Sequence, residues 1–253
     1  KMLIKNKTNS FLHTVHVLFR REDIVEEKNL KNTVVVVLDI LFATTTIVSA
    51  IANGARLVIP VRDEKSAREV ASQYTRESSV LAGELYAETI SGFASPTPLA
   101  LGETGLKNKV LIYSTTNGTV ALNQASESNT VYVGSLINAK AVVEKICSFD
   151  RNKSILVLCS GSMGLPNLED AYGAGYFVDL LMKHRSGDIK TYSDAALAAQ
   201  RIFLSGQPEE TLFLSRVGRL MVERGKEREV KYAANLSKLD IAPELENNQV
   251  VVK

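Results

Sequence analysis

The sequence has few cysteines, no excess of either charge and no long apolar run, and each of these absences excludes a class of protein. Its only cysteines, Cys147 and Cys159, form no Cys-x-x-Cys pair and lie in or beside apolar stretches. We therefore exclude a disulfide-stapled miniprotein and a thiolate zinc site, and we predict a reduced, cytoplasmic protein. With 253 residues, of which 45% are hydrophobic and 23% charged, the composition also excludes collagen-like chains and intrinsic disorder.

The charge balance limits the choice of partner. Lysine and arginine total 30 against 28 aspartate and glutamate residues, which gives a formal net charge of +2. Proteins that neutralise nucleic-acid phosphates usually carry a clustered basic excess, so we predict no nucleic-acid partner. The segment 1–10 is polar, and no apolar stretch is long enough to cross a bilayer, so we predict neither a signal peptide nor a membrane contact. A small anionic molecule remains compatible with this composition.

Several nucleotide-binding and catalytic motifs are missing as well. The chain has no Gly-x-x-x-x-Gly-Lys-Ser/Thr phosphate loop and no Gly-x-Gly-x-x-Gly after a strand, which disfavours ATP and dinucleotide ligands. It has no Gly-x-Ser-x-Gly elbow, and its histidines, His13, His16 and His184, lack the spacing of metal ligands on a loop. A serine hydrolase and a histidine-dependent phosphatase are therefore disfavoured.

The sequence does contain a repeated alternation of buried strands and helices. Runs of β-branched residues predict strands buried on both faces, as in a parallel sheet, and hydroxyl or glycine residues separate several of them from a helix. The predicted strands are 34–38, 57–61, 80–82, 110–114, 130–134 and 154–159, and the predicted helices are 47–54, 64–74, 120–126, 138–147 and 168–184. We predict an α/β fold with a largely parallel sheet and helices on both faces. It forms one domain over 1–253 or two lobes dividing near residue 130.

The last third of the chain has a different character. Eight of the thirteen residues from Arg219 to Lys231 are charged, which predicts a solvated helix face rather than a binding patch. The run 250–252 predicts a short edge strand or an ordered tail.

Ligands of an open parallel sheet bind beyond the carboxyl ends of its strands. Amides and hydroxyls at helix starts hold oxyanions, and carboxylate oxygens suit Mg²⁺, so we predict an anion and a divalent cation as the ligand pair. The strand-end rule selects Asp39, Thr44, Thr45, Thr46, Glu84, Thr115, Thr116, Asn117, Gly118, Thr119, Gly134, Ser135, Asn138, Ser160, Gly161, Ser162, Met163, Gly164, Glu169 and Asp170.

Each of these features also has a purely structural interpretation. Asp39 could cap its own turn, and the threonines 44–46 could serve as an N-cap with ordinary packing. The Asn117-Gly118 pair is a common hairpin signal, although the helical segment after it favours an anion-holding loop. Glu169 and Asp170 could simply complement a helix dipole.

Six motifs follow one another in the sequence. They are Asp39-Ile40-Leu41-Phe42-Ala43-Thr44-Thr45-Thr46-Ile47 with Ala52-Asn53-Gly54-Ala55, Ala82-Gly83-Glu84, Ser95-Pro96, Thr115-Thr116-Asn117-Gly118-Thr119, Gly134-Ser135-Leu136-Ile137-Asn138-Ala139, and Leu168-Glu169-Asp170 with Ala174-Gly175. In this order they resemble the 2-phosphosulfolactate phosphatase family, the magnesium-dependent acid phosphatases first associated with coenzyme M biosynthesis. The resemblance extends from about residue 14 to 243. It implies hydrolysis of 2-phosphosulfolactate, a phosphorylated sulfonic acid, to 3-sulfolactate and phosphate, and it is compatible with a homodimer.

The resemblance implies roles for the selected residues. Asp39, Glu169 and Asp170 would be catalytic, and Asp39, Glu84 and Asp170 would hold Mg²⁺. The loops 44–46, 115–119 and 160–161 would bind the phosphoryl oxygens. Asp39 could attack phosphorus itself or act through water, and the lack of an Asp-x-Asp pair at 39–41 favours water.

Two departures from the family pattern keep other functions open. Many members carry Arg where this chain has Phe42, and Asn where it has Ala94. Loss of an arginine removes a bidentate anion partner, which allows a paralogue that acts on another small phosphoester. A binding module that senses a phosphorylated or sulfonated acid without turnover is a second alternative, and a sugar-phosphate or nucleotide enzyme is a third.

Overall fold

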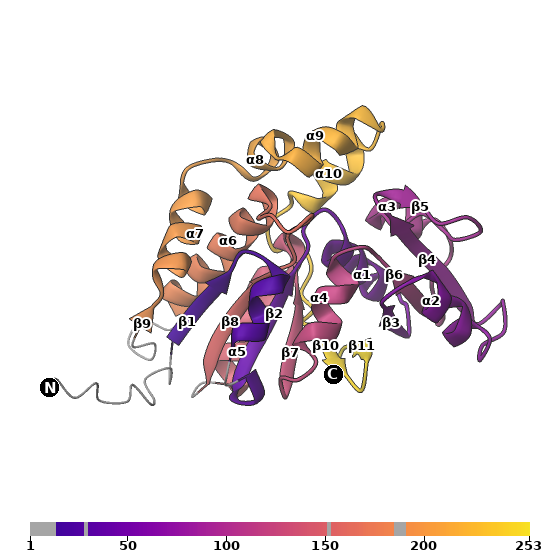
Figure 1. The fold of residues 1–253 in the computed structure, drawn as a ribbon, viewed down its shortest axis with the longest axis horizontal. Helices are drawn as coiled ribbons and strands as arrows, with labels where there is room; N and C mark the ends of the chain where they lie inside the picture. The colour runs from indigo at the N-terminus through magenta and orange to yellow at the C-terminus, as the bar shows by residue number, and fades with distance from the viewer. Residues whose placement is uncertain (1–13, 28–29, 151–152, 185–190) are drawn as a thin grey trace, which may run out of the picture.

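The computed structural model describes residues 14–27, 30–150, 153–184 and 191–253, and its strands form one eleven-stranded sheet. The order across the sheet is β5-β4-β6-β3-β11-β10-β7-β2-β8-β1-β9 (Figure 1). The strands are β1 (Thr14–Leu18), β2 (Thr33–Leu38), β3 (Leu57–Val61), β4 (Ser79–Leu85), β5 (Glu88–Thr89), β6 (Val110–Ser114), β7 (Thr130–Gly134), β8 (Ser154–Cys159), β9 (Thr191–Tyr192), β10 (Glu244–Glu246) and β11 (Gln249–Val251). All six predicted strands are present, with small shifts at their ends.

Two parallel groups of strands make up most of this sheet. One group is β4-β6-β3 and the other is β7-β2-β8-β1-β9. The antiparallel hairpin β10–β11 joins them, because Glu244 pairs with Tyr132 of β7 and Val250 pairs with Val58 of β3. The prediction of an edge strand at 250–252 is therefore wrong. Val250 is fully buried in the interior of the sheet, since the hairpin fills the space between the two groups.

The two parallel groups of strands do not come from an earlier and a later part of the sequence. The segment 57–114 supplies β3, β4 and β6, whereas β2, which precedes it, lies between β7 and β8. The two groups of strands therefore do not correspond to residues before and after position 130.

Helices cover both faces of the sheet, as predicted (Figure 1). Helices α5, α6 and α7 lie on one face of the β7-β2-β8-β1 group, and α1 and α4 lie on the other. The helices are α1 (Ala43–Ala52), α2 (Glu64–Ala71), α3 (Pro98–Gly102), α4 (Gly118–Ala125), α5 (Ala139–Phe149), α6 (Leu168–His184), α7 (Asp194–Leu204), α8 (Pro208–Leu214), α9 (Arg216–Glu223) and α10 (Glu227–Ala233), with short 3-10 turns η1 (Arg21–Glu26), η2 (Leu30–Asn32) and η3 (Leu136–Asn138). Among the described residues, no helix is both long and apolar enough to cross a membrane.

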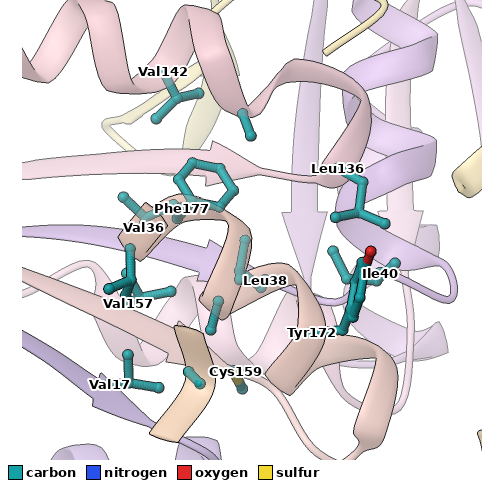
Figure 2. Close-up of a cluster of buried hydrophobic side chains, with 14 of the residues drawn as sticks. Val17, Val36, Leu38, Ile40, Leu136, Val142, Val157, Cys159, Tyr172 and Phe177 are labelled. Atoms are coloured by element: carbon teal, nitrogen blue, oxygen red, sulfur yellow. The ribbon is translucent and has the colours of Figure 1, made fainter. Parts of the chain in front are cut away.

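The valine run of β2 explains why helices are needed on both sides. Successive side chains of a strand point to opposite faces, and all five residues from Val34 to Leu38 are fully buried. Val36 and Leu38 pack with Phe177 of α6 in one core (Figure 2), whereas Val35 and Val37 belong to the core beneath α1 and α4. Each buried side chain contributes roughly 1.5–3 kcal/mol relative to exposure.

The charged segment 219–231 forms parts of two helices, not one solvated face. Gly225, with a φ of +70°, separates α9 from α10. Glu229 of α10 is buried, and its carboxylate accepts hydrogen bonds from Thr97 Oγ1 (2.7 Å) and from the backbone nitrogen of Leu99 (2.8 Å). The prediction of a uniformly solvated face is wrong at this residue, because Glu229 joins α10 to the start of α3.

Connections diverge from the middle of the second parallel group. From β2 the chain passes through α1 to β3 on one side, whereas from β8 it passes to α6 and then to β9 on the other side. Since β2 and β8 are neighbours, their carboxyl ends form a topological switch point, which is where ligands of open α/β sheets bind. Asp39 and Ser160 follow these two strands directly.

Candidate active site

A cavity of about 400 Å³ opens at this switch point. Asp39 lines it, and the polar side chains around it come from η1, the ends of β4, β6 and β8, and α9 with the loop after it. These are Arg21, Glu84, Thr115, Thr116, Asn117, Ser162, Asn167, Arg216 and Lys226. Two larger hollows are less suitable. One of about 790 Å³ around Tyr132 and Lys145 contains none of the predicted site residues, and one of about 600 Å³ beside α2 shares Glu84, Thr115 and Thr116 but lacks Asp39, so we assign the site to the cavity that Asp39 lines.

The threonines of α1 hold the loop that carries Asp39. Thr44 Oγ1 donates to the Asp39 carbonyl oxygen (3.0 Å) and accepts from the Asp39 backbone nitrogen (2.9 Å). Thr45 Oγ1 donates to Ile40 O (2.8 Å), and Thr46 Oγ1 donates to Pro96 O (2.8 Å). All three threonines are fully buried inside the first turn of α1, so their hydroxyls are engaged in internal hydrogen bonds instead of lining the cavity.

The loop between β6 and α4 divides its polar groups between structure and cavity. Thr115 and Thr119 bond reciprocally, each backbone nitrogen donating to the other hydroxyl at 3.1 Å, which fixes the start of α4. Thr115, Thr116 and Asn117 line the cavity, and Asn117 Oδ1 accepts from Arg21 Nη1 at 2.9 Å. A Cβ on Gly118 would lie 2.6 Å from Asp39 Oδ2, so only glycine lets α4 begin against this carboxylate.

Glu84 connects β4 to the same loop. Its Oε1 accepts from the Thr116 backbone nitrogen (2.6 Å), and its Oε2 accepts from the Ala87 backbone nitrogen (2.6 Å) and from Thr116 Oγ1 (3.0 Å). The Glu84 carboxylate lies near enough to Asp39 to raise the pKa of that acid. Glu84 thus shapes the cavity wall and places a second negative charge beside Asp39.

The turn after β8 is organised around Asp170 of α6. Asp170 Oδ1 accepts from the Ile40 backbone nitrogen (2.9 Å), and Oδ2 accepts from the Gly161 backbone nitrogen (3.1 Å). Ser160 and Asp170 are fully buried, and neither lines the cavity. Gly161 has a φ of +59°, and a Cβ there would lie 2.7 Å from Leu165 O. Asp170 therefore ties the carboxyl ends of β2 and β8 together.

Three buried acids share this region, and the pKa of each is raised. Burial, and then the charge of Glu84, raises the pKa of Asp39 to about 6, while hydrogen bonds from Ser160 and Ala43 act in the opposite direction. Burial raises the pKa of Glu169 to about 7, and burial with the charge of Asp39 raises the pKa of Asp170. Such clusters of shifted acids gather at functional sites.

Glu169 lies behind the cavity wall. It is 1% exposed, and its Oε2 makes no hydrogen bond within the described residues. A hydrogen bond from its own backbone nitrogen, one from Ser215 and the charge of Arg216 partly offset the rise in its pKa. The arrangement leaves a buried carboxylate oxygen whose charge is balanced only at a distance.

Sequence reasoning missed the cations of the cavity. Arg21 follows the carboxyl end of β1, a strand that we did not predict, and the strand-end rule would have found it had that strand been recognised. Arg216 and Lys226 come from the region of α9 and α10, far from any strand end. Lys226 belongs to the charged run 219–231, for which we predicted a solvated face rather than a binding patch, and that prediction is wrong at Lys226 because it lines the cavity. Phe42, one of the two departures from the family pattern, also lines the cavity.

The carboxylates of the cavity suit a magnesium ion that keeps water ligands better than a metal ion held entirely by protein side chains. The described residues contain no group of three acidic, histidine or cysteine side chains arranged around a metal. Mg²⁺, however, is commonly held by one or two carboxylates, with water and phosphate oxygens as its other ligands. Asp39 and Glu84 both line the cavity and repel each other, so a divalent cation between them would relieve that repulsion.

A switch-point cavity with an ionisable acid, an arginine and polar loop groups defines an α/β enzyme site for a small anion. A model of the 2-phosphosulpholactate phosphatase family matches residues 18–248, so the chain belongs to this family. A probable 2-phosphosulfolactate phosphatase of Carboxydothermus hydrogenoformans is 36% identical over 242 residues, which cover 94% of this chain and 97% of that protein. Proteins of the same name from Symbiobacterium thermophilum and Clostridium novyi are 33% and 31% identical, and the matches cover 89% and 91% of this chain and 96% of each relative.

Proposed function

We propose that this protein is a Mg²⁺-dependent phosphatase that hydrolyses 2-phosphosulfolactate to 3-sulfolactate and phosphate. The observation that carries the proposal is Asp39, a carboxylate with a raised pKa that faces the switch-point cavity beside Arg21. Membership in the family and the names of the relatives support the choice of substrate.

The phosphoryl group would bind between η1 and the loop after β6. Arg21 Nη1 donates to Asn117 Oδ1 (2.9 Å) and to Ser160 O (3.2 Å), which orients its guanidinium at the cavity wall. A guanidinium placed in this way matches two oxygens of a phosphate, and its attraction grows as negative charge develops in the transition state. Arg21 is thus the main anion-binding group at the Asp39 end of the cavity.

Asp39 would act as the general base. Without the metal ion the pKa of Asp39 is about 6, which leaves the carboxylate ionised near neutral pH, so that it can hold the ion through one oxygen and accept a proton at the other. Asp39 takes a proton from the attacking water as the water oxygen bonds to phosphorus. The bond between phosphorus and the C2 oxygen breaks, and that oxygen takes up a proton from solvent to become the hydroxyl of 3-sulfolactate.

Glu169 and Asp170 would act through Asp39. Asp170 fixes the backbone of Ile40 and Gly161, and both acids lie behind the cavity wall. In this proposal they are positioning residues that hold the Asp39 loop in a field of negative charge.

Asp39 and Glu84 would hold the magnesium ion at the cavity. The ion supplies Lewis-acid neutralisation of the phosphate oxygens when it is bound. The hydrogen bonds from Thr116 and Ala87 keep the Glu84 carboxylate turned toward the Asp39 side of the cavity wall.

The test is phosphate release from 2-phosphosulfolactate with and without Mg²⁺. We expect release to require Mg²⁺ and to fall about a thousandfold in Asp39→Asn, because removal of a general base costs about 10²–10⁴ in rate. Asp194→Asn, an exposed acid at the start of α7, is the matched control and should keep full activity. Full activity after chelation or in Asp39→Asn would refute the mechanism.

Magnesium binding can be measured without turnover. Mg²⁺ should raise the midpoint of thermal unfolding of the wild-type protein near neutral pH, since a ligand of the native state stabilises it. The rise should be lost in Glu84→Gln and kept in Asp194→Asn. An equal rise in all three proteins would place the ion elsewhere.

Phe42 in the cavity wall favours a second candidate, a paralogue with another small phosphoester substrate. A panel of phosphorylated 2-hydroxy acids separates the two proposals. The highest kcat/KM on 2-phosphosulfolactate supports the first, and a clear preference for another ester supports the second.

A further inference from the structure

The cavity contains two cations that the hydrolytic step at Asp39 does not use. Arg216, the first residue of α9, and Lys226, directly before α10, both line it. Within the described part of the chain, neither side chain lies within ion-pair distance of a carboxylate, although Arg216 is near enough to the buried Glu169 to lower its pKa. Positive charge in a concave site is a means of binding an anion.

Arg216 is held in a fixed orientation at the cavity wall. Its Nη2 donates to Ser162 Oγ and to Asn167 Oδ1, the latter at 3.1 Å, and Ser162 Oγ in turn donates to Asn167 Oδ1 at 2.8 Å. Ser162 and Asn167 are buried. Because polar side chains of the segment between β8 and α6 orient this guanidinium, little freedom is lost when it binds a ligand.

Lys226 is placed by the hydrogen bonds of its own backbone. Its nitrogen donates to Met221 O (2.8 Å), and its carbonyl oxygen accepts from the Glu229 nitrogen (3.0 Å). The buried carboxylate of Glu229 then fixes α10 to Thr97 and Leu99. Figure 1 shows α9 and α10 above the sheet, on the same side as the loops that follow β2 and β8. Lys226 is therefore brought to the cavity by tertiary structure.

The cations that line the cavity come from different elements. Arg21 of η1 is bonded to Asn117 and Ser160, whereas Arg216 of α9 is bonded to Ser162 and Asn167. In the proposed mechanism Arg21 binds the phosphate, so a ligand that also contacts Arg216 and Lys226 must carry a second anionic group. A cavity of about 400 Å³ is of the size that accommodates one small molecule.

We propose that Arg216 and Lys226 bind the second acidic group of the substrate, a sulfonate or carboxylate, and so restrict the enzyme to phosphomonoesters that carry one. The proposal rests on the phosphatase function proposed above and adds the residues that select the substrate. A planar guanidinium donates two parallel hydrogen bonds to such an oxyanion, and the ammonium group adds charge.

The experiment compares two esters of a secondary alcohol, 2-phosphosulfolactate and isopropyl phosphate, which lacks both the carboxylate and the sulfonate. In Arg216→Gln and in Lys226→Met, kcat/KM for 2-phosphosulfolactate should fall about 10–100-fold, mainly through KM, as expected for loss of a charged hydrogen bond. In Lys226→Met, kcat/KM for isopropyl phosphate should change by less than about twofold, because this ester has no group for Lys226 to bind. In Arg216→Gln, which also removes a positive charge near Glu169, kcat/KM should fall at least about tenfold more for 2-phosphosulfolactate than for isopropyl phosphate. The matched controls are Arg219→Gln and Arg228→Met, both exposed and outside the cavity lining.

Equal losses on both esters, or no loss on either, would overturn the proposal. Calorimetry with 3-sulfolactate, which has both acids but no phosphate, provides a second measurement that needs no turnover. Binding should weaken about tenfold or more in Arg216→Gln and Lys226→Met and persist in Arg219→Gln. If the wild-type protein hydrolyses neither ester but shows this pattern of binding, the phosphatase function fails and the acid-binding role of Arg216 and Lys226 stands. Unchanged 3-sulfolactate binding in both variants refutes that role whether or not the protein is a phosphatase.

Discussion

The segments after β2 and β6 have the same order of features but contribute differently to the site. Each follows a buried strand, and each contains threonines at or near the start of a helix. After β2, the hydroxyls of 44–46 are buried in internal hydrogen bonds, and the loop presents a carboxylate, Asp39, to the cavity. After β6, Thr115 and Thr116 line the cavity themselves. A hydroxyl-rich strand end therefore identifies a site region without showing which oxygens meet the ligand.

The largest expected effect on stability concerns the buried charge of the first loop. The folded pKa of Asp39, about 6, lies above its ordinary value of 3.8. The stability that this acid contributes when protonated is thus present below about pH 4 and lost as the pH rises through about 6. The wild type loses this stability as the pH rises, whereas Asp39→Asn does not. The free energy of unfolding of Asp39→Asn relative to wild type should therefore rise by roughly 3 kcal/mol from below about pH 4 to above about pH 6.

Urea unfolding of both proteins near pH 4 and near pH 8 measures this change. Asp194→Asn, on an exposed helix start, should show a far smaller pH-dependent difference. An equal difference between Asp39→Asn and wild type at both pH values would contradict the raised pKa.

Gly118→Ala should produce the next largest effect, because it acts where the two loops meet. The added Cβ would lie 2.4 Å from the Cβ of Ala43 and 2.6 Å from Asp39 Oδ2. We expect destabilisation by about 2 kcal/mol from overpacking, together with loss of phosphatase activity as Asp39 is displaced. Gly102→Ala is the control, since its nearest new neighbour would be the Asn53 side chain at 3.3 Å. Urea unfolding gives the loss of stability of both variants, and the rate of phosphate release gives their activity. A fully active Gly118→Ala would show that Asp39 tolerates movement.

The smallest effect separates a structural threonine from one that faces the cavity. Thr45→Val removes the hydroxyl that lies 2.8 Å from Ile40 O and 2.6 Å from Ser135 Oγ, which should cost about 1–2 kcal/mol of stability. Thr116→Val lies at the half-buried cavity wall, so it should cost less stability and lower kcat/KM more. Urea unfolding and steady-state kinetics on the pair give both quantities. The reverse pattern would mean that the two loops have exchanged roles.

Much of the fold could be predicted because its signals are local. A continuous β-branched run such as 34–38 needs cover on both faces, and that requirement alone indicates a parallel sheet with helices on each side. Asp39 was found for the same reason, since the end of a buried strand is visible in the sequence. The position of β11 was missed because three valines do not show which strands flank them, and Val58, the partner of Val250 in β3, lies far away in the chain.

The cations of the site could not be predicted because tertiary contacts bring them there. Arg216 and Lys226 lie in or beside helices whose sequences are typical of a solvated surface. Their positions at the cavity depend on tertiary contacts. The Glu229 carboxylate of α10 accepts hydrogen bonds from the start of α3, and Ser162 and Asn167 orient the Arg216 guanidinium. None of these pairings has a fixed spacing in the sequence.

The hairpin β10–β11 also has a consequence for the order in which the chain can fold during synthesis. Its residues, 244–251, leave the ribosome after both of the strands that they connect, β3 and β7. Until then the two parallel groups can each assemble, but their facing edges stay unpaired and open to other chains. The late hairpin thus closes the sheet during biogenesis, and any delay in its arrival lengthens the time during which those edges are exposed.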